Sequence, residues 1–412
     1  MSADFMEHPR VAVTGLGLLT ALGLDLETSW QGLLAARTPF KRFSLFDPEG
    51  LASPFGAELP EGAAELFKQH VKLRRRRQMT RGTMMTVVAA HMALDDSGVD
   101  RKTVPAERIG VVMGATGTGY APRTTDTDEH RILRNMASAP AAWVSIQEKA
   151  GGPSFVVSTA CSSGAYAFHA AIGLIQSGQC DVVLAGAGDS ALTYLDVQGF
   201  CSLMALSEDA HCPERASRPF SRDRNGFVMG EGAGVLVLES LEHARARAAR
   251  VYAELSPPGL CAETYNIVSP EPDGRGMARA MGLALQNAGL DPSAVDYVNA
   301  HGTSTPLNDV YETKAIKSVF GDRAKQLPVS ATKSMTGHCL SAAAGVEAVI
   351  CCKALAENTI PPTANLTDPD PECDLDYVPG APRQQQLNSV MCNSFGFGGH
   401  NGVCIFTRPG VH

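Results

Sequence analysis

The chain has 412 residues, of which 44% are hydrophobic and 19% charged, a balance that can bury a sizeable core and excludes a largely disordered protein. Its 35 basic against 43 acidic residues give a net charge of −8, which excludes a general attraction to nucleic acid or to anionic membranes. No uninterrupted apolar run approaches the roughly 20 residues that span a bilayer, so we expect no membrane-spanning segment.

The N-terminus and the cysteines narrow the class further. The first ten residues, MSADFMEHPR, lack the charged and apolar regions of a secretory signal, and we expect a cytoplasmic protein. The eleven cysteines include no CxxC pair and no Cys/His group with zinc spacing. We therefore expect thiols that pack or catalyse, and neither a disulfide framework nor a metal site.

Short apolar runs that end in small residues alternate with Ala-rich amphipathic stretches, which is typical of α/β units on largely parallel sheets. The first run resembles half of a dinucleotide-binding fingerprint, but Thr20 stands at the third glycine position and argues against a nucleotide site. In chain order the predicted strands are Val11–Gly17, Arg108–Gly114, Ser154–Thr159, Asp181–Gly186, Val295–Ala300 and Pro328–Thr332.

A faint internal repeat indicates two related α/β halves. Residues 93–100, the end of a predicted helix, precede the strand and glycine turn of residues 109–117, and residues 284–291 precede residues 295–302 in the same way. Any α/β protein can produce such coincidences. We place the halves at residues 1–255 and 256–412, each bringing one strand-to-helix corner to a shared centre.

One basic cluster interrupts the acidic chain. A solvated helix face and a docking surface for an acidic partner both fit such a cluster, and because like charges this dense repel one another we favour docking. The cluster comprises Lys68, Lys72, Arg74, Arg75, Arg76 and Arg77.

Cys161, in the segment VVSTACSSGA, is the strongest candidate nucleophile. It lies between a predicted buried strand and a predicted helix over Tyr166–Ser177. Unsatisfied N–H groups and the positive end of the helix dipole at such a corner favour the thiolate. The same N–H groups can face the oxygen of a carbonyl under attack. Most of the other cysteines are interpreted as buried packing residues.

Two histidines and a lysine stand in surroundings that are unusual for their types. His301 lies in NAHGTSTP and His338 in SMTGH, among Gly, Ser and Thr rather than the apolar residues that surround a packed imidazole. Lys333 precedes His338 by five positions in a segment too small and polar for a solvated lysine face. We expect these three side chains to act together with Cys161.

A glycine-rich aromatic loop, NSFGFGGHNG, follows a buried run near the C-terminus. Gly396 and Gly398 allow the backbone to approach a substrate closely, while Phe395 and Phe397 can cover it. A plain turn before a final strand would not explain two phenylalanines.

With these residues identified, the chain closely resembles the β-ketoacyl-acyl-carrier-protein synthases, in particular the type II elongating condensing enzymes of fatty acid and polyketide synthesis. The resemblance covers nearly all of residues 10–408 and implies an α/β, thiolase-like fold with two related halves in an α-β-α-β-α sandwich. Its most specific motifs are TACSSG, RPFSRDRNGFVMGEGAG, VNAHGTSTPLND, ATKSMTGH and CNSFGFGGHNG.

The resemblance implies a role for each catalytic residue. Cys161 would take an acyl chain from a carrier-protein thioester, with its own N–H and that of Phe397 forming the oxyanion hole. His301 and His338 would stabilise the enolate formed when malonyl carrier protein loses CO₂. Lys333 would order His338 and the local charge.

The resemblance also implies supporting positions and partners. Glu312 would pair with Lys333 or order its loop, and Phe397 would be a gate that Gly396 and Gly398 allow to swing. Acidic acyl carrier protein would dock on the basic cluster, and the enzyme would use no cofactor. We expect a homodimer or a heterodimer with a chain-length-factor-like subunit. Further supporting residues are Phe395, Thr303 and Thr305.

Three features differ from the family's housekeeping fatty acid members. Thr116 or Gly117 stands where a bulky aliphatic residue usually limits the acyl pocket, which would admit a longer, stiffer or more polar chain. The segment between residues 120 and 152 is short. Residues 263–268 and His400 replace the usual residues near the pantetheine channel. A ketosynthase subunit of a secondary-metabolite synthase, active only with a chain-length-factor partner, is the alternative.

Other classes fit less well. A chain-length factor would lack the nucleophile Cys161, and a degradative thiolase would carry a second cysteine in a C-x-G loop where this chain has Cys392-Asn393-Ser394. An initiating ketoacyl synthase would use Cys, His and Asn. A cysteine hydrolase needs one base and an open path for water, and a binding protein would require an inert Cys161.

Overall fold

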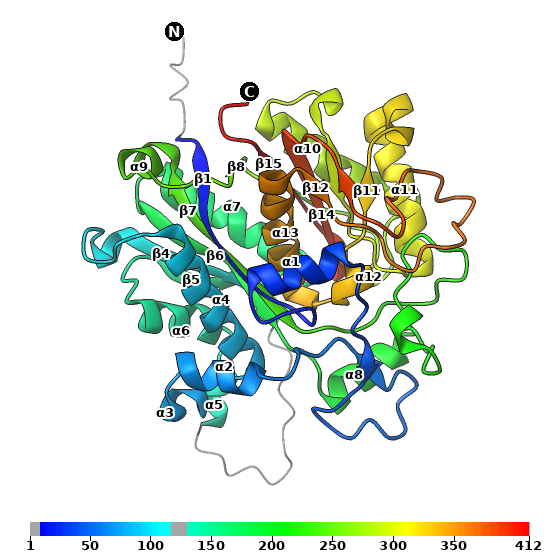
Figure 1. The fold of residues 1–412 in the computed structure, drawn as a ribbon, viewed down its shortest axis with the longest axis horizontal. Coiled ribbons are helices and arrows are strands. Elements are labelled where there is room, and N and C mark those ends of the chain that lie inside the picture. Colours follow the sequence, from blue (N-terminus) through cyan, green and yellow to red (C-terminus); the bar gives the residue numbers. More distant parts are fainter. Residues whose placement is uncertain (1–8, 117–129, 412) are drawn as a thin grey trace.

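The computed structural model describes residues 9–116 and 130–411, in which two groups of strands share one pairing pattern (Figure 1). In the first group β1 is antiparallel to β7 and β7 to β6, whereas β6 is parallel to β4 and β4 to β5. Its strands are β1 (Val11–Leu19), β4 (Ile109–Gly114), β5 (Ser154–Val157), β6 (Val182–Asp189) and β7 (Gly232–Ser240).

The second group repeats this pattern strand for strand. β9 is antiparallel to β15 and β15 to β14, whereas β14 is parallel to β10 and β10 to β11. This shared topology confirms the predicted pair of related α/β halves. The strands are β9 (Gly259–Ala262), β10 (Tyr297–Asn299), β11 (Val329–Ser330), β14 (Ser389–Gly396) and β15 (His400–Thr407).

A short strand joins the two groups into one mixed sheet. β8 (Ala253–Leu255) pairs with β1 on one side and with β15 on the other, and the predicted division after residue 255 falls at its end. Two small two-stranded antiparallel sheets stand apart from this sheet: β2 (Lys41–Arg42) with β3 (Phe55–Gly56), and β12 (Thr359–Ile360) with β13 (Arg383–Gln384).

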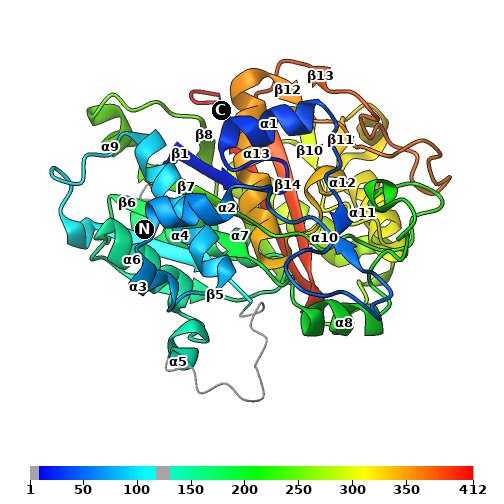
Figure 2. The same cartoon turned by 60° about the horizontal axis from the view of Figure 1, so that its bottom comes forward.

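Helices form three layers around the two groups of strands (Figures 1 and 2). α4 (Arg81–Ser97) and α6 (Ala139–Glu148) cover the first group, and α10 (Arg275–Ala288) packs on β9 and β15 with α11 (Pro306–Phe320) beside it. Between them, α7 (Ser163–Gln176) and α13 (Ala343–Glu357) contact strands of both groups. The predicted α-β-α-β-α sandwich is therefore confirmed.

Shorter helices complete the described chain. α1 (Leu26–Leu34) packs against β1, and α2 (Ala63–His70) packs against α4. The others are α3 (Leu73–Arg76), α5 (Arg131–Arg134), α8 (Tyr194–Ser202), α9 (Leu241–Ala246) and α12 (Lys333–Thr336).

The central strands are buried on both faces because helices cover each side. All nine residues of β1 and all eight of β6 are buried, and their sequences are continuous runs of small and apolar residues. Glycine allows the close packing of β7 on α13, since a Cβ on Gly234 would lie 2.3 Å from the carbonyl carbon of Gly345. These contacts hold the start of α13 next to the site described below.

The first apolar run is longer than predicted and has no phosphate-binding turn. Gly15 and Gly17 lie within β1, where a Cβ on either would meet the backbone of α4 at about 2 Å. The half-fingerprint is therefore a packing feature of a continuous strand. Among residues 9–116 and 130–411, no helix has the length and hydropathy to cross a membrane.

Candidate functional site

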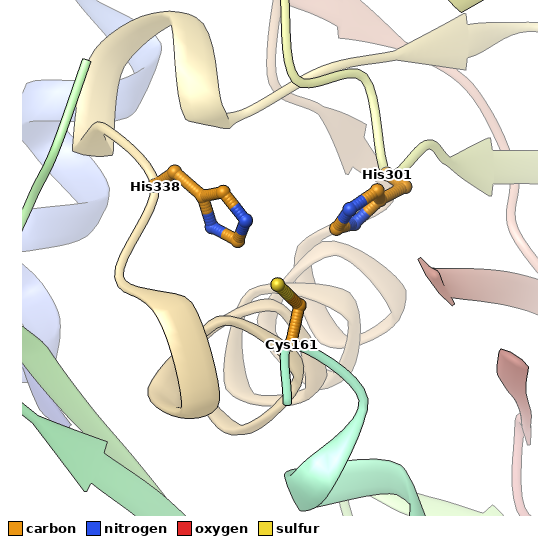
Figure 3. A group of neighbouring side chains, drawn as sticks. All are labelled: Cys161, His301 and His338. Atoms are coloured by element: carbon orange, nitrogen blue, oxygen red, sulfur yellow. The ribbon is translucent and has the colours of Figure 1, made fainter. Parts of the chain in front are cut away.

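Strand ends from both halves bring the predicted catalytic residues together. Cys161 follows β5, and His301 follows β10. β11 leads through Lys333, the first residue of α12, to His338. Parallel pairing aligns the ends of neighbouring strands, with Asn299 opposite Ser330 in β11. This alignment brings His301 and His338 together, and Cys161 reaches them from β5 of the other half (Figure 3).

The cysteine and the two imidazoles form a compact cluster. Cys161 Sγ and a nitrogen of each of His301 and His338 lie within 4.8 Å of one another. The two rings are nearly perpendicular, at 85°, with centroids 5.4 Å apart, and Figure 3 shows both beside the sulfur. Ala160, with φ of +50°, turns the chain sharply before the nucleophile. This arrangement can hold a thioester between Cys161 and two imidazole donors.

The ionisation expected for Cys161 is wrong. Burial raises the pKa of its thiol to about 11, although the Lys333 charge and the N–H groups of Phe397 and Cys161 act in the opposite direction. Desolvation therefore outweighs the electrostatic effects of the strand-to-helix corner. At neutral pH Cys161 is a thiol. The two N–H groups that contact it are the pair predicted to form the oxyanion hole.

Alkylation of Cys161 by iodoacetamide is expected to accelerate about tenfold per pH unit between pH 7 and pH 10, because only the thiolate reacts and its fraction grows as pH rises toward the raised pKa. Peptide mass spectrometry resolves this residue from the exposed Cys212, which reports on reagent quality. A rate that is already constant between pH 6 and pH 8 would show an ionised thiol and contradict this electrostatic description.

Both histidines are neutral at physiological pH. Burial lowers the pKa of His301 and of His338 well below the usual value, and the nearby Lys333 charge lowers both further. The N–H of Leu340 donates to Nδ1 of His338 at 3.3 Å, which leaves the proton on Nε2. His338 is therefore preset as a hydrogen-bond donor at Nε2. Nδ1 of His301 has no hydrogen-bond partner within the described chain.

Glu312 orders the loop that carries His301, one of its two predicted roles. Its carboxylate accepts hydrogen bonds from the N–H groups of His301 and Gly302, both at 2.8 Å, and from Nδ2 of Asn393 at 2.9 Å. The alternative, a pair with Lys333, is wrong because Lys333 has another partner.

That partner is Glu347, a residue the sequence analysis missed. The Lys333 ammonium forms an ion pair with its carboxylate, and both side chains are 2% exposed. Burial raises the pKa of Glu347 to about 7, and the Lys333 charge opposes this shift. An acidic residue in the otherwise apolar first ten residues of helix α13 was the available signal. Within this pair, the Lys333 charge lies close enough to both histidines and to the thiol to lower the pKa of each.

The aromatic loop closes the site from the side of β14. Phe395 is buried, with its ring centroid 5.8 Å from that of His301, and Phe397 begins the turn that leads to β15. Gly398 has φ of +80°, a conformation that favours glycine. A Cβ on Gly396 would come within 3.1 Å of the Cys161 nitrogen. The loop thus approaches the nucleophile as predicted.

Residues 263–268 contact this loop directly. The N–H of Gly398 donates to the Ile267 carbonyl at 2.7 Å, and that of Glu263 donates to the Gly399 carbonyl at 3.0 Å. The Asn401 side chain donates to the Glu263 carboxylate at 2.9 Å. Residues 263–268, which differ from the housekeeping pattern, are therefore hydrogen-bonded to the loop that carries the predicted gate, Phe397.

A cavity of about 390 Å³ leads from the cluster to the surface. Cys161, His301, His338 and Phe397 line it. Thr303 and Thr305 also line it, with their hydroxyls 2.8 Å apart. Its volume suits an extended acyl or pantetheine arm.

The Cys-His-His cluster does not suit a metal ion. A metal would need a lone pair on the nitrogen of His338 that faces the cluster. Because Nδ1 of this ring accepts from Leu340, the proton occupies Nε2, and only one ring nitrogen of a neutral imidazole carries a lone pair. The arrangement suits hydrogen-bond donation instead.

The remaining predicted positions lie outside the cluster. Thr116 lines the cavity, whereas Gly117 lies outside the described residues. In the basic cluster, Lys68 forms an ion pair with Glu65 at 3.0 Å, and the Arg75 guanidinium donates a hydrogen bond to the side-chain oxygen of Gln147. The exposed members are Lys68, Lys72, Arg74 and Arg77, and the half-buried ones are Arg75 and Arg76.

The chain is similar to proteins of one family. The family model described as "Beta-ketoacyl synthase, N-terminal domain" matches residues 8–244. The model described as "Beta-ketoacyl synthase, C-terminal domain" matches residues 252–367. A 3-oxoacyl-[acyl-carrier-protein] synthase 2 of Synechocystis sp. is 42% identical over an alignment of 420 positions, which covers 98% of this chain and 99% of that relative.

Solved structures agree with the sequence comparisons. The ishigamide ketosynthase/chain length factor is 32% identical with a TM-score of 0.89, over 98% of this chain and all of that chain. A ketosynthase bound to a hexaketide, in complex with its type II polyketide synthase acyl-carrier protein, is 31% identical with a TM-score of 0.87, over 97% and 99% of the two chains.

Proposed function

We infer the reaction of this chain from one premise: the chain belongs to the β-ketoacyl synthase family. It is a condensing acyltransferase that joins an acyl thioester to malonyl carrier protein and forms a 3-ketoacyl-carrier protein and CO₂. The observation that carries this function is the meeting of Cys161 with the neutral donors His301 and His338 in the wall of a large cavity.

In the first step Cys161 Sγ attacks the carbonyl carbon of an acyl-carrier thioester. The carbonyl electrons move to oxygen, where the N–H groups of Cys161 and Phe397 stabilise the charge. When the intermediate collapses, the bond to the carrier sulfur breaks, and this sulfur leaves as a thiol with the proton that Cys161 has lost. The proton of the Cys161 thiol passes to the carrier sulfur as this bond breaks, so both imidazoles remain neutral N–H donors.

In the second step the two imidazoles donate N–H groups to the malonyl thioester carbonyl. The C–C bond to the malonyl carboxylate breaks, CO₂ leaves, and the electron pair remains as an enolate that these donors stabilise. The enolate carbon attacks the acyl carbonyl on Cys161. The C–S bond to Cys161 then breaks, the 3-ketoacyl-carrier protein leaves, and the Cys161 thiolate takes up one proton from solvent.

Intact-mass spectrometry after mixing with a panel of acyl carrier proteins tests the first step. We expect a mass increase of one acyl group, which peptide mapping places on Cys161. Mapping to another residue, or no adduct in the presence or absence of a chain-length-factor partner, would contradict the proposal.

Acyl carrier protein is the proposed partner, and the basic cluster on α2 and α3 its docking surface. Its exposed side chains can meet an acidic partner. The fatty acid relative is named for its carrier-bound substrate, and one structural neighbour holds a carrier protein.

Reversing two exposed charges of this surface, Arg74→Glu with Arg77→Glu, is expected to raise the KM for acyl carrier protein about tenfold and to flatten its dependence on salt. Arg245→Glu, at an exposed position of α9, is the control and is expected to leave KM unchanged. Steady-state rates at several salt concentrations measure both. An unchanged KM in the double variant would contradict docking on this surface and would leave the cluster as a solvated helix face.

The second candidate function is that of a secondary-metabolite ketosynthase that acts with a chain-length-factor subunit. The small, polar Thr116 beside the nucleophile and the likeness to a ketosynthase/chain length factor favour it. We propose a dimer in either case, and a cytoplasmic enzyme. Recovery of acylation only after addition of the second subunit would distinguish this function from that of a homodimeric fatty acid enzyme.

A further inference from the structure

We propose that Ser394 is a positioning residue that holds the two N–H groups of the oxyanion hole, those of Cys161 and Phe397, in place relative to each other. The inference rests on the proposed function and concerns its first step, the attack of Cys161 Sγ on an acyl thioester. It starts from a buried hydrogen bond that joins the second half of the chain to the nucleophile.

The two N–H groups belong to different halves of the chain. Cys161 follows β5 in the first half, and Phe397 follows β14 in the second. Within the described chain β5 pairs with β4 alone, and β14 pairs with β10 and β15. No shared strand ladder fixes the two donors relative to each other, although both contact the same sulfur. Contacts other than strand pairing must therefore set their separation.

Ser394 supplies a direct link between the halves. Its hydroxyl donates to the carbonyl oxygen of Cys161 at 2.9 Å, and the residue is 1% exposed. The hydrogen-bond ladder of α7 begins one residue later, where the Ser162 carbonyl accepts from the N–H of Tyr166 at 3.2 Å. Among the described residues Ser394 is the donor to the Cys161 carbonyl, and without its hydroxyl this buried carbonyl would have no partner.

Two glycines allow the strands to approach closely enough for this bond. Gly396, two residues after Ser394, lies so near the nucleophile that a Cβ would come within 3.1 Å of the Cys161 nitrogen. Gly402 lies opposite Ser394 on β15, and a Cβ there would lie 2.7 Å from a side-chain atom of α7. The hydroxyl therefore acts where the two halves are in closest contact, three residues before Phe397.

The bond matters because an oxyanion hole requires both donors to face the same point. Attack on the thioester places negative charge on one oxygen, which both N–H groups must reach at hydrogen-bond distance. Loss of the hydroxyl would leave the Cys161 carbonyl unpaired and would release the end of β14 from the nucleophile segment. The N–H of Phe397 would then lose its fixed position, and a misplacement of about 1 Å can cost about 100-fold in rate.

The test compares two reactions of the same sulfur in full-length Ser394→Ala, with the second subunit present where acylation needs one. Acylation by acyl carrier protein develops an oxyanion, whereas alkylation by iodoacetamide displaces iodide and develops none. Peptide mass spectrometry follows both reactions at Cys161 at one pH. We expect the ratio of the acylation rate to the alkylation rate to fall about tenfold to a hundredfold. A wild-type ratio would overturn the inference, since a folding defect or a displaced sulfur slows both reactions.

Ser389→Ala is the matched control. Ser389 begins the same strand, β14, is 2% exposed, and donates its hydroxyl to the Ala294 carbonyl at 2.6 Å. This variant therefore loses the same kind of buried bond at the other end of the strand, and it is expected to keep the wild-type ratio. An equal fall of the ratio in both variants would assign the effect to the stability of β14 and overturn the role of Ser394.

Ser394→Cys separates the hydrogen bond from the volume of the side chain. It keeps the shape and replaces the hydroxyl with a weak S–H donor, so it also serves if Ser394→Ala does not fold. We expect a ratio of acylation to alkylation at Cys161 below that of the wild type and above that of Ser394→Ala. A wild-type ratio in Ser394→Cys would show that the hydrogen bond does not position the donors.

The wild-type protein distinguishes failure of this inference from failure of the proposed function. Acylation of wild-type Cys161, together with an unchanged ratio in Ser394→Ala, would refute the role of Ser394 and retain the condensing enzyme. Absence of acylation of the wild type by every carrier protein, with or without the second subunit, would refute the proposed function and this inference with it.

Discussion

Cys161→Ala is expected to abolish condensation, with a loss of at least about 10⁴-fold in kcat/KM, because the variant has no atom that can hold the acyl chain. Folding should survive, since the change removes one sulfur at a 7% exposed position and costs roughly 1 kcal/mol. Carrier-bound product measured by mass spectrometry, together with the Tm, reports both effects.

Cys161→Ser is the matched variant, because its hydroxyl keeps the shape of the side chain but is a far weaker nucleophile at neutral pH. We expect an unchanged Tm and at most a trace of acyl adduct. Product formation by Cys161→Ala at the wild-type rate would reassign the nucleophile to another residue and refute the roles proposed for His301 and His338.

Lys333→Ala is expected to lower the free energy of unfolding by about 3–5 kcal/mol and to abolish condensation. The loss of stability follows because Glu347 would remain buried without its ion-pair partner. Chemical denaturation measures the first effect, and turnover measured in the remaining folded protein tests the second.

The double variant Lys333→Met with Glu347→Leu separates the two effects. Replacing both charges with apolar side chains should restore most of the stability, because no uncompensated charge stays buried. Activity should remain low. The Lys333 charge lowers the pKa of His301, His338 and Cys161, so its removal makes the imidazoles easier to protonate and the thiol harder to ionise.

The pH profile of the double variant gives the sign of this effect. Neutral imidazoles are the working form, so a higher histidine pKa moves the acid limb of the residual kcat/KM profile to higher pH. An acid limb at the wild-type position would show that Lys333 does not act on the histidines. Wild-type activity in the double variant would show that the Lys333–Glu347 pair contributes to stability and not to catalysis.

The fold could be predicted from the sequence because the strands of each half are visible as local sequence patterns. Apolar runs that end in small residues mark the buried strands, and their order recurs in the second half, so β4 and β10 were both identified. Cys161 and His301 stood out because small polar residues surround them at strand ends. These signals are local in the chain and need no knowledge of packing.

The missed features depend on contacts between distant segments. Glu347 meets Lys333 only because α13 packs in the central layer. The expected thiolate was wrong for the same reason. Its local corner favours ionisation, but both halves close over Cys161, and the resulting desolvation dominates.

The central claim is condensation on Cys161, and the most direct test follows carbon from malonyl carrier protein into product. Protein first acylated on Cys161 is mixed with malonyl carrier protein labelled with ¹³C at C2, with the second subunit present where acylation required it. We predict a labelled 3-ketoacyl-carrier protein two carbons longer than the loaded chain, together with an emptied Cys161. Loss of CO₂ without chain extension, or an acyl group that stays on Cys161, would contradict the account.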